Sequence, residues 1–255
     1  MELLNRHCAV ERRGEVAWLT IHEAGRANIL STAVILALTE GLGLLGREAG
    51  LRAIVLTGSG ERSFIGGADL REMAALDPAS AEAFITRLGG LCEAARQCPL
   101  PVVARIQGWA LGGGLELAMA CDLRVAAPGA QFAMPEVKVG IPSVIHAALM
   151  PRLIGWGRAR WMLMTAATID AATALDWGLI DAVAGPEGLD AAVEAALAPI
   201  LECEPRAIAA QKALLRQWEE LPLTASVAAS VPVFAEAFTT DAPGRAMRRA
   251  LTRKG

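Results

Sequence analysis

Short apolar runs and longer helical stretches alternate along the first half of the chain. Residues 16–22 and 52–60 are compact apolar runs bounded by charged or small residues, which predicts strands. Residues 30–46 are apolar over a helical length, and residues 79–97 place apolar side chains at helical spacing. This alternation, which continues to about residue 135, is typical of an α/β fold with largely parallel sheets.

The rest of the chain has one more group of predicted strands and is then mostly helical. Residues 100–108 predict a strand that two nearby prolines keep from becoming a helix, and residues 122–134 predict two strands joined by a Pro-Gly turn. From about residue 143 the pattern is mostly helical, and only residues 179–184 predict another strand. No linker rich in serine and glycine separates the two halves.

The composition fits one folded domain, with or without a small addition. The 255 residues are 54% hydrophobic and 20% charged, which is enough apolar material for a sizeable core. A net charge of −3 and the absence of a basic stripe argue against nucleic acid as a partner. The short basic segment at residues 248–255 is typical of the solvated end of a helix.

The cysteines and the N-terminus bear on the compartment. Five cysteines stand at scattered spacings without a Cys-x-x-Cys pair, which favours reduced thiols over a disulfide framework or a zinc site. The N-terminus has no apolar signal region, and no run reaches the roughly 18 apolar residues of a transmembrane helix. We therefore expect a cytoplasmic protein with no membrane partner and no bound metal.

Glu116 stands in an unusual place. Residues 108–117, GWALGGGLEL, follow a buried strand and open a helix, so free backbone N–H groups converge there. Their spacing matches neither a P-loop nor a dinucleotide-binding fingerprint. Close helix packing explains the glycines, but it does not explain a carboxylate among Leu115, Leu117 and Met119. Burying that charge is costly, so Glu116 needs a partner or a perturbed pKa, and both favour a functional role.

Two other segments offer related chemistry. Residues 63–73, SFIGGADLREM, place two glycines before a helical turn, which either presents free N–H groups or simply leaves Asp69 as a helix cap. Glu136 follows a proline at the end of a short strand, where an ordinary loop glutamate paired with Lys138 is the alternative. Two carboxylates at converging junctions can hold a water, one removing its proton while the other delivers a proton elsewhere. The three histidines show no ligand spacing.

Together, the two glycine segments resemble those of the enoyl-CoA hydratase/isomerase (crotonase) superfamily. The resemblance rests on SFIGGADLREM and GWALGGGLELAMACDLRVAAPGAQFAMPEVKVGIP, and it extends to GRANILS, TIDAATALDWGLIDAVA and PRAIAAQKALL. It implies an α/β fold built as a spiral of ββα turns, with a core at residues 1–195. It also implies a C-terminal helical trimerisation region at residues 196–255 and assembly as a homotrimer or homohexamer.

The resemblance also implies a site for an acyl-CoA thioester. The backbone N–H groups of Ala68 and Gly113 match the family's oxyanion hole, and Glu116 and Glu136 match the two glutamates of its hydratases. The implied reaction is the reversible addition of water to a 2-enoyl-CoA, giving a 3-hydroxyacyl-CoA. It needs no metal or other cofactor, because coenzyme A is part of the substrate. The positions that match CoA-binding segments are Arg26, Ala27, Gly67, Ala68, Asp69, Leu70, Arg71, Gly112, Gly113 and Lys212.

One loop departs from the family pattern. After Glu136 the family usually continues with a longer, glycine-rich loop, whereas this chain has VGIPSVIHAALMPRLIG. In the family that loop shapes the acyl pocket, here Pro142, Ser143 and His146, so the resemblance does not define the acyl group. A plain helix histidine is the alternative for His146, and a solvated lysine is the alternative for Lys212. The alternative activities are an isomerase, a decarboxylase, a dehydratase of an unusual acyl-CoA, or a CoA-binding subunit without catalysis.

Overall fold

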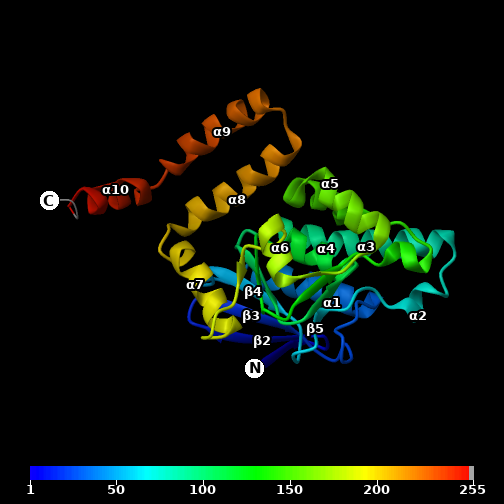
Figure 1. Ribbon diagram of the computed structural model, residues 1–255. Helices are drawn as coiled ribbons and strands as arrows, with labels where there is room; N and C mark the ends of the chain where they lie inside the picture. The colour runs from blue at the N-terminus through cyan, green and yellow to red at the C-terminus, as the bar shows by residue number, and fades with distance from the viewer. Residues whose placement is uncertain (253–255) are drawn as a thin grey trace. The chain divides into compact units, whose positions relative to one another are not determined.

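The computed structural model describes residues 1–252 of the chain (Figure 1). These residues belong to two compact units, Met1–Leu197 and Ala198–Gly255. The predicted boundary, after residue 195, lies close to this division. The described strands all belong to the first unit, and the described part of the second unit is helical.

The first unit contains a seven-stranded sheet. Its strands lie in the order β1 (Glu2–Asn5), β2 (Cys8–Arg13), β3 (Val16–Ile21), β4 (Ala53–Thr57), β6 (Val102–Ile106), β8 (Leu123–Ala126) and β11 (Ala182–Val183). β1 to β3 form an antiparallel meander, and from β3 onward neighbouring strands are parallel. The prediction of a largely parallel sheet is therefore confirmed. β1 and β2 were not predicted, because charged residues interrupt their apolar positions.

A second, four-stranded sheet carries short strands that follow those of the first sheet along the chain. Its order is β10 (Ile169–Asp170), β9 (Gln131–Ala133), β7 (Trp109–Leu111) and β5 (Ser63–Ile65). β5, β7 and β9 are parallel to one another. β5 follows β4, β7 follows β6 and β9 follows β8, and helices follow β5 and β7. This order of two strands and a helix is the repeated ββα unit that the resemblance implies.

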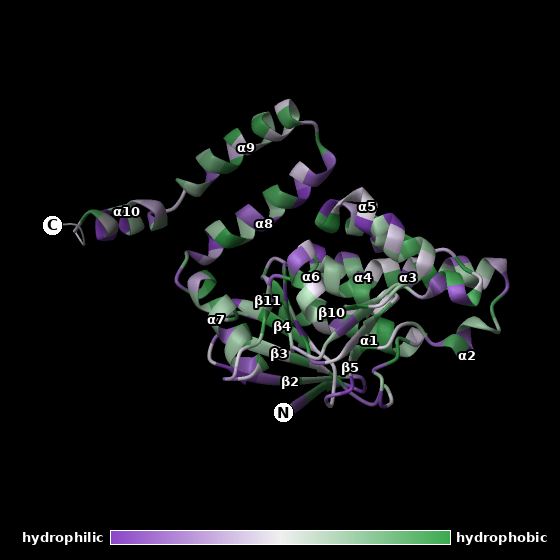
Figure 2. Cartoon of the chain, in the orientation of Figure 1, coloured by the Kyte–Doolittle hydropathy of each residue, from purple (hydrophilic) through white to green (hydrophobic). Residues whose placement is uncertain are grey.

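Helices α1 (Thr32–Leu45) and α3 (Pro78–Gln97) pack against each other in the first unit. Side-chain caps define their starts, since Ser31 accepts the N–H of Val34, and Asp77 and Ser80 form a capping box. Figure 2 shows hydrophobic residues along the fully buried β4 and hydrophilic residues on β2. The other helices of this unit are α2 (Leu70–Met73), α4 (Gly113–Ala120), η1 (Glu136–Val139), η2 (Ile145–Leu149), α5 (Met150–Thr165) and α6 (Ala171–Trp177), and α7 (Leu189–Leu201) crosses the boundary.

Two local predictions need correction. A strand was expected at residues 179–184, but the structure has one only at Ala182–Val183. Gly178 ends α6, and the N–H of Leu179 donates to the carbonyl of Ala174 in that helix, so Leu179 is not available to a strand. The two-residue strand β10 was not predicted, since so short an apolar run carries no period. The five cysteines are free, as predicted, and all but Cys203 are buried.

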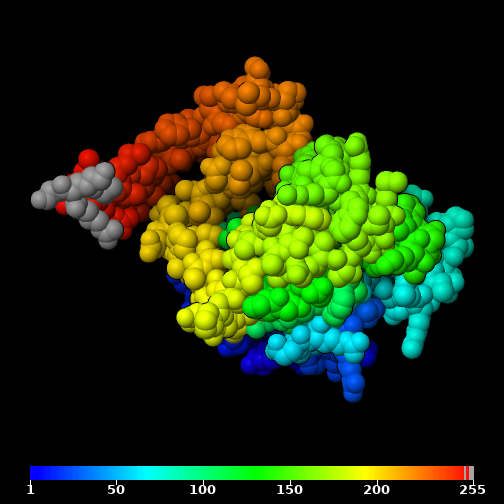
Figure 3. All heavy atoms as spheres, in the orientation of Figure 1, coloured from blue at the N-terminus to red at the C-terminus, as the bar shows by residue number. Residues whose placement is uncertain are grey.

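The second unit consists of α8 (Pro205–Glu220), α9 (Leu223–Ala237) and α10 (Ala242–Thr252). α8 and α9 pack against each other, as the orange segments of Figure 3 show. Residues 248–252 of the basic C-terminal segment belong to α10, and residues 253–255 lie outside the described residues. Within residues 1–252 no single helix is long and apolar enough to cross a membrane. Only the sharply bent pair Leu223–Ala237 and Ala242–Arg249 has that length and composition together.

Candidate active site

Three parallel strands of the small sheet end side by side. Ile65 of β5 pairs with Ala110 of β7, and Ala110 pairs with Phe132 of β9. Because the carboxyl ends of parallel strands meet at one edge of a sheet, the segments that follow them are neighbours. Those segments are Gly66 to Ala68, Gly112 to Gly113, and Met134 to Glu136, and they contain both predicted oxyanion-hole residues and one of the two predicted glutamates.

Glycines allow the first two segments to approach each other at backbone distance. A Cβ on Gly114 would lie 2.5 Å from the carbonyl oxygen of Ile65, which no side chain permits. Gly67 adopts φ +102°, and a Cβ there would lie 3.3 Å from the carbonyl oxygen of Leu111. The glycines therefore serve both the close contact and the backbone conformation, rather than helix packing alone.

The N–H groups of Ala68 and Gly113 do not donate to the carbonyl groups of the described residues around them. Leu30 donates to the Gly67 carbonyl at 2.9 Å, and Asp69 donates to the Leu30 carbonyl at 3.1 Å, so the N–H of Ala68 between them is not used. Gly113 is the first residue of α4, where an N–H group has no intrahelical acceptor. Both residues line the same cavity, so two free donors are available to one ligand.

Glu116 lies in the first turn of α4 and is only 3% exposed. Its Oε1 accepts a hydrogen bond of 2.9 Å from the backbone N–H of Ala147 in η2. Burial raises the pKa of this carboxyl to about 8, and the nearby Glu136 adds to the rise, while the Ala147 hydrogen bond works against it. Glu116 can therefore carry or accept a proton near neutral pH, which suits general acid–base chemistry.

Glu136 begins η1 and is half-buried. The hydroxyl of Ser143 donates to its Oε2 at 2.9 Å. Its Oε1 lies against Gly112, where a Cβ would collide with it. The described residues show no ion pair between Glu136 and Lys138, so the alternative of a paired loop glutamate finds no support.

Both glutamates and both free donors line a single cavity of about 290 Å³. Gly67, Leu70, Gly112 and Pro142, which were also predicted as site residues, belong to its lining. Apart from Lys138, the remaining wall is apolar and comes from Gly66, Met73, Phe84, Ile85, Leu88, Leu111, Pro135, Val139, Ile141 and Val144. The cavity thus combines polar groups at one place with an apolar wall, the usual character of a small-molecule site.

Other predicted residues lie near the cavity or away from it. Ala27 accepts the N–H of Gly66 at 2.7 Å, and Asp69 caps α2 by accepting the N–H groups of Arg71 and Glu72. Arg26 and Arg71 are exposed and do not line the cavity.

Three further predicted residues do not line the cavity. Ser143 contacts Glu136, and His146 contacts Glu93 of α3 at 2.8 Å. Lys212 lies on α8 of the second unit with its side chain buried. Within residues 1–252 no group of His, Cys, Asp and Glu side chains could hold a metal ion.

Sequence reasoning missed several residues of this site. Phe84, Ile85 and Leu88 form one face of the predicted helix 79–97, so the helical spacing was the signal that could have assigned them to a wall. The backbone donor on Ala147 has no signal in the sequence, since every residue except proline carries an N–H group.

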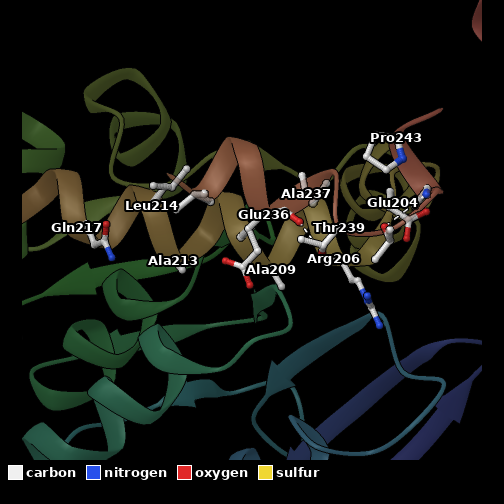
Figure 4. A pocket seen from close by; sticks show the side chains of 15 residues that line it. Glu204, Arg206, Ala209, Ala213, Leu214, Gln217, Glu236, Ala237, Thr239 and Pro243 are labelled. Atoms are coloured by element: carbon white, nitrogen blue, oxygen red, sulfur yellow. Dashed lines mark hydrogen bonds between the residues drawn. The ribbon is translucent and has the colours of Figure 1, made fainter. Parts of the chain in front are cut away.

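A larger hollow of about 510 Å³ lies in the second unit between α8 and α9. Figure 4 shows its wall of alanines, with the charged side chains of Glu204, Arg206 and Glu236 around it. Glu204 is half-buried and the other two are exposed, so none is buried as Glu116 is. The candidate chemistry therefore belongs to the cavity of the first unit.

The chain is similar to known proteins over nearly its whole length. The family profile described as enoyl-CoA hydratase/isomerase matches residues 11–252. The Short-chain-enoyl-CoA hydratase of Clostridium acetobutylicum is 31% identical over 242 residues, which is 94% of this chain and 92% of that protein. The Crotonyl-CoA hydratase of Syntrophomonas wolfei is 32% identical and covers 91% of this chain and 90% of its own.

Solved structures show the same similarity in three dimensions. Pseudomonas aeruginosa DspI superposes with a TM-score of 0.92 at 31% identity, covering 98% of this chain and 95% of its own. An enoyl-CoA hydratase from Bacillus anthracis superposes with a TM-score of 0.90 at 29% identity, covering 97% of this chain and 96% of its own.

Proposed function

The chain belongs to the enoyl-CoA hydratase/isomerase family, and from that premise we propose that it is an enoyl-CoA hydratase. It adds water reversibly to a 2-enoyl-CoA and forms a 3-hydroxyacyl-CoA. One observation carries the proposal: Glu116, Glu136, Ala68 and Gly113 all line one cavity.

In this proposal the thioester oxygen binds between the N–H groups of Ala68 and Gly113. Addition of water at Cβ moves negative charge onto that oxygen, and donors that are already oriented stabilise the resulting enolate. Removal of one such donor costs about 3 kcal/mol of transition-state stabilisation in acyl-transfer enzymes. Neither donor uses an intramolecular acceptor in its local pairing, so neither needs to break a hydrogen bond before it binds substrate.

The two glutamates divide the proton transfers. Glu116 removes a proton from the water that attacks Cβ, and Glu136 supplies the proton that Cα receives. In the reverse direction Glu136 removes the proton from Cα, and Glu116 returns a proton to the departing hydroxyl. A pKa of about 8 makes Glu116 a stronger base than an exposed glutamate, because burial destabilises its charged form.

The substrate is an acyl-CoA thioester with an apolar acyl group. The apolar wall of the cavity supports this, and so do the printed names of the relatives, one a hydratase of short-chain enoyl-CoA and one of crotonyl-CoA. The addition is redox-neutral and the donors and carboxylates account for each charge, so the proposal includes no cofactor. Arg26, Ala27, Asp69, Arg71 and Lys212 remain predicted contacts of the CoA portion. Assembly as a homotrimer or homohexamer and a cytoplasmic location also remain predictions.

The test is hydration of crotonyl-CoA by the purified protein, followed as loss of the conjugated thioester absorbance. Product analysis should find 3-hydroxybutyryl-CoA. A panel of enoyl-CoA chains of increasing length and branching would then define the acyl group. Binding of the thioesters with no turnover across this panel would contradict the proposal and favour a CoA-binding subunit. A shifted double bond without water addition would favour an isomerase.

A further inference from the structure

A five-residue segment, Ser143 to Ala147, reaches both glutamates of the cavity. At one end the Ser143 hydroxyl donates to Glu136 Oε2 at 2.9 Å. At the other end the Ala147 N–H donates to Glu116 Oε1 at 2.9 Å. The segment therefore links the two carboxylates through its own backbone, and a shift of the segment moves a hydrogen-bond partner of each.

His146 connects this segment to α3 by a hydrogen bond, which we call the anchor. Its ring Nε2 lies 2.8 Å from Glu93 Oε1, and its side chain is 11% exposed. Arg96 and Gln97 also donate to Glu93, at 2.7 and 3.1 Å. Partial burial alone would raise the pKa of Glu93. The hydrogen bonds from His146 and Gln97 and the charge of Arg96 outweigh it, so the pKa lies below its usual value. An ionised Glu93 can only accept, so the proton of the shared hydrogen bond belongs to His146.

Ile145, next to this anchor, has a backbone conformation that costs energy. Its φ is +40°, which is a genuine outlier for a β-branched residue. Its side chain lies against Gly89 of α3, where a Cβ would be 3.4 Å from Ile145 Cγ2, an ordinary van der Waals contact. Such strain persists only where the surrounding contacts determine the conformation, and it concentrates at functional sites. The hydrogen bonds at Ser143, His146 and Ala147 provide those contacts.

The geometry points to residues 143–147 as a clamp that holds both catalytic carboxylates in place, with Ser143 and His146 as positioning residues. Ser143 orients Glu136 directly, and His146 acts through Ala147 on Glu116. This assignment rests on the proposed hydratase function. It also gives Ser143 and His146 a task other than lining the acyl pocket.

Kinetics of clamp variants on crotonyl-CoA test the assignment. Ser143→Ala and His146→Leu each remove a hydrogen bond, and since displacing a reacting group by about 1 Å can cost ~100-fold, we expect kcat to fall at least ~10-fold. KM should change by less than ~2-fold, because the groups that bind the thioester stay in place. Ser143→Thr keeps the hydroxyl and His146→Gln keeps a donor near the Nε2 position, so both should restore most of kcat.

Matched controls separate positioning from general loosening of the fold. Ser80→Ala removes another hydroxyl that bonds a carboxylate, Asp77, at the start of α3. His7→Leu removes another buried histidine, which bonds the carbonyl of His22. Both controls should keep kcat even where thermal unfolding shows lost stability. Unchanged kcat in the two clamp variants, or an equal loss in the controls or in the conservative variants, would overturn the clamp.

A readout without turnover keeps this test separate from that of the proposed function. The chain contains one His-Ala peptide bond, at residues 146–147, so ¹³C-carbonyl histidine with ¹⁵N-alanine isolates a single amide signal. In the wild-type protein this signal should shift as Glu116 titrates. The other titratable or charged groups around it are Glu136 of η1, Cys92, Glu93 and Arg96 of α3, and His146 itself. His146→Leu would remove the labelled pair itself, so the test uses Glu93→Ala, which removes the partner of the His146 ring and keeps the His-Ala peptide bond. In Glu93→Ala the dependence should disappear. A signal that still follows Glu116 would refute the anchor, even for a protein that hydrates no enoyl-CoA.

Discussion

Glu116 and Glu136 share a cavity but differ in what surrounds them. Glu116 stands on a regular helix, is 3% exposed and accepts a backbone N–H. Glu136 opens a 3₁₀ turn, is half-buried and accepts a side-chain hydroxyl. The main chain therefore provides the polar partner of one carboxylate, and a replaceable side chain provides that of the other.

This difference shows how each carboxylate can be perturbed. No substitution except proline removes the Ala147 N–H, so Glu116 responds to changes in the position of η2 and in its own burial. Glu136 responds directly to its neighbours, Ser143 on one oxygen and Gly112 on the other. Variants at these positions can therefore test whether the two roles are separate.

The largest expected effect comes from the carboxylates themselves. Glu116→Gln and Glu136→Gln should each lower kcat for crotonyl-CoA by at least ~100-fold, since each removes a positioned acid or base. The double variant should be little slower than the slower single variant, because both groups serve one addition. Steady-state kinetics of the four proteins measures this, with the exposed Glu187→Gln as the control. A near-normal rate in either single variant would contradict the paired mechanism.

A methyl group at Gly112 should collide directly with Glu136. In Gly112→Ala the new Cβ collides with Glu136 Oε1, so the carboxylate must move, and we expect kcat to fall by ~10- to 100-fold. Gly112 also has φ +50°, so part of any stability loss comes from the backbone. Gly50→Ala, at φ +90° with nothing within 4 Å, carries that strain without the collision and should keep full activity. Equal kinetics for the two variants would show that Glu136 tolerates the displacement.

The third expected effect concerns the pH dependence of stability and not the rate of turnover. The folded-state pKa of Glu116 is raised from 4.5 to about 8, so the folded chain holds a proton that the unfolded chain releases between these values. The protonated Glu116 therefore adds to the free energy of unfolding. This addition is fully present below pH 4.5 and is lost as the pH rises to about 8, at up to about 1.4 kcal/mol for each pKa unit.

Glu116→Gln should remove this dependence, because its amide does not titrate. Urea unfolding should find the variant close to the wild type at about pH 4.5 and more stable at about pH 9. A constant difference across this range would mean that the burial of Glu116 has no cost in the folded protein.

Sequence periodicity predicted the long elements better than the short ones. Helix 79–97 and the strands at 52–60 and 100–108 were predicted because each is long or apolar enough to show its period. The three-residue strands β5 and β7 show no period, yet they place the glycine segments beside each other. Pairing between segments distant in sequence, not local pattern, defines this part of the fold.

The candidate site was predictable where local chemistry was unusual. Glu116 stood out because a carboxylate among buried apolar residues needs an explanation. Ser143 and His146 were singled out because they follow Glu136 in a loop that departs from the family pattern. Their contacts with Glu136 and Glu93 depend on tertiary structure. Two hydrogen bonds between segments 53 and 7 residues apart cannot be derived from composition or period.

The irregular pairing of β5 with β7 has a consequence for insertions and deletions. Ser63 pairs with Trp109 but Ile65 pairs with Ala110, so β5 uses one residue more than β7 over the same span. After that extra residue, Ala68 and Gly113 each lie three positions beyond a paired residue, which brings their N–H groups level. Deleting Phe64 would shift one donor against the other by about 3.3 Å, the rise of one strand residue. The spacing of this segment therefore matters to the site as much as the identity of its residues.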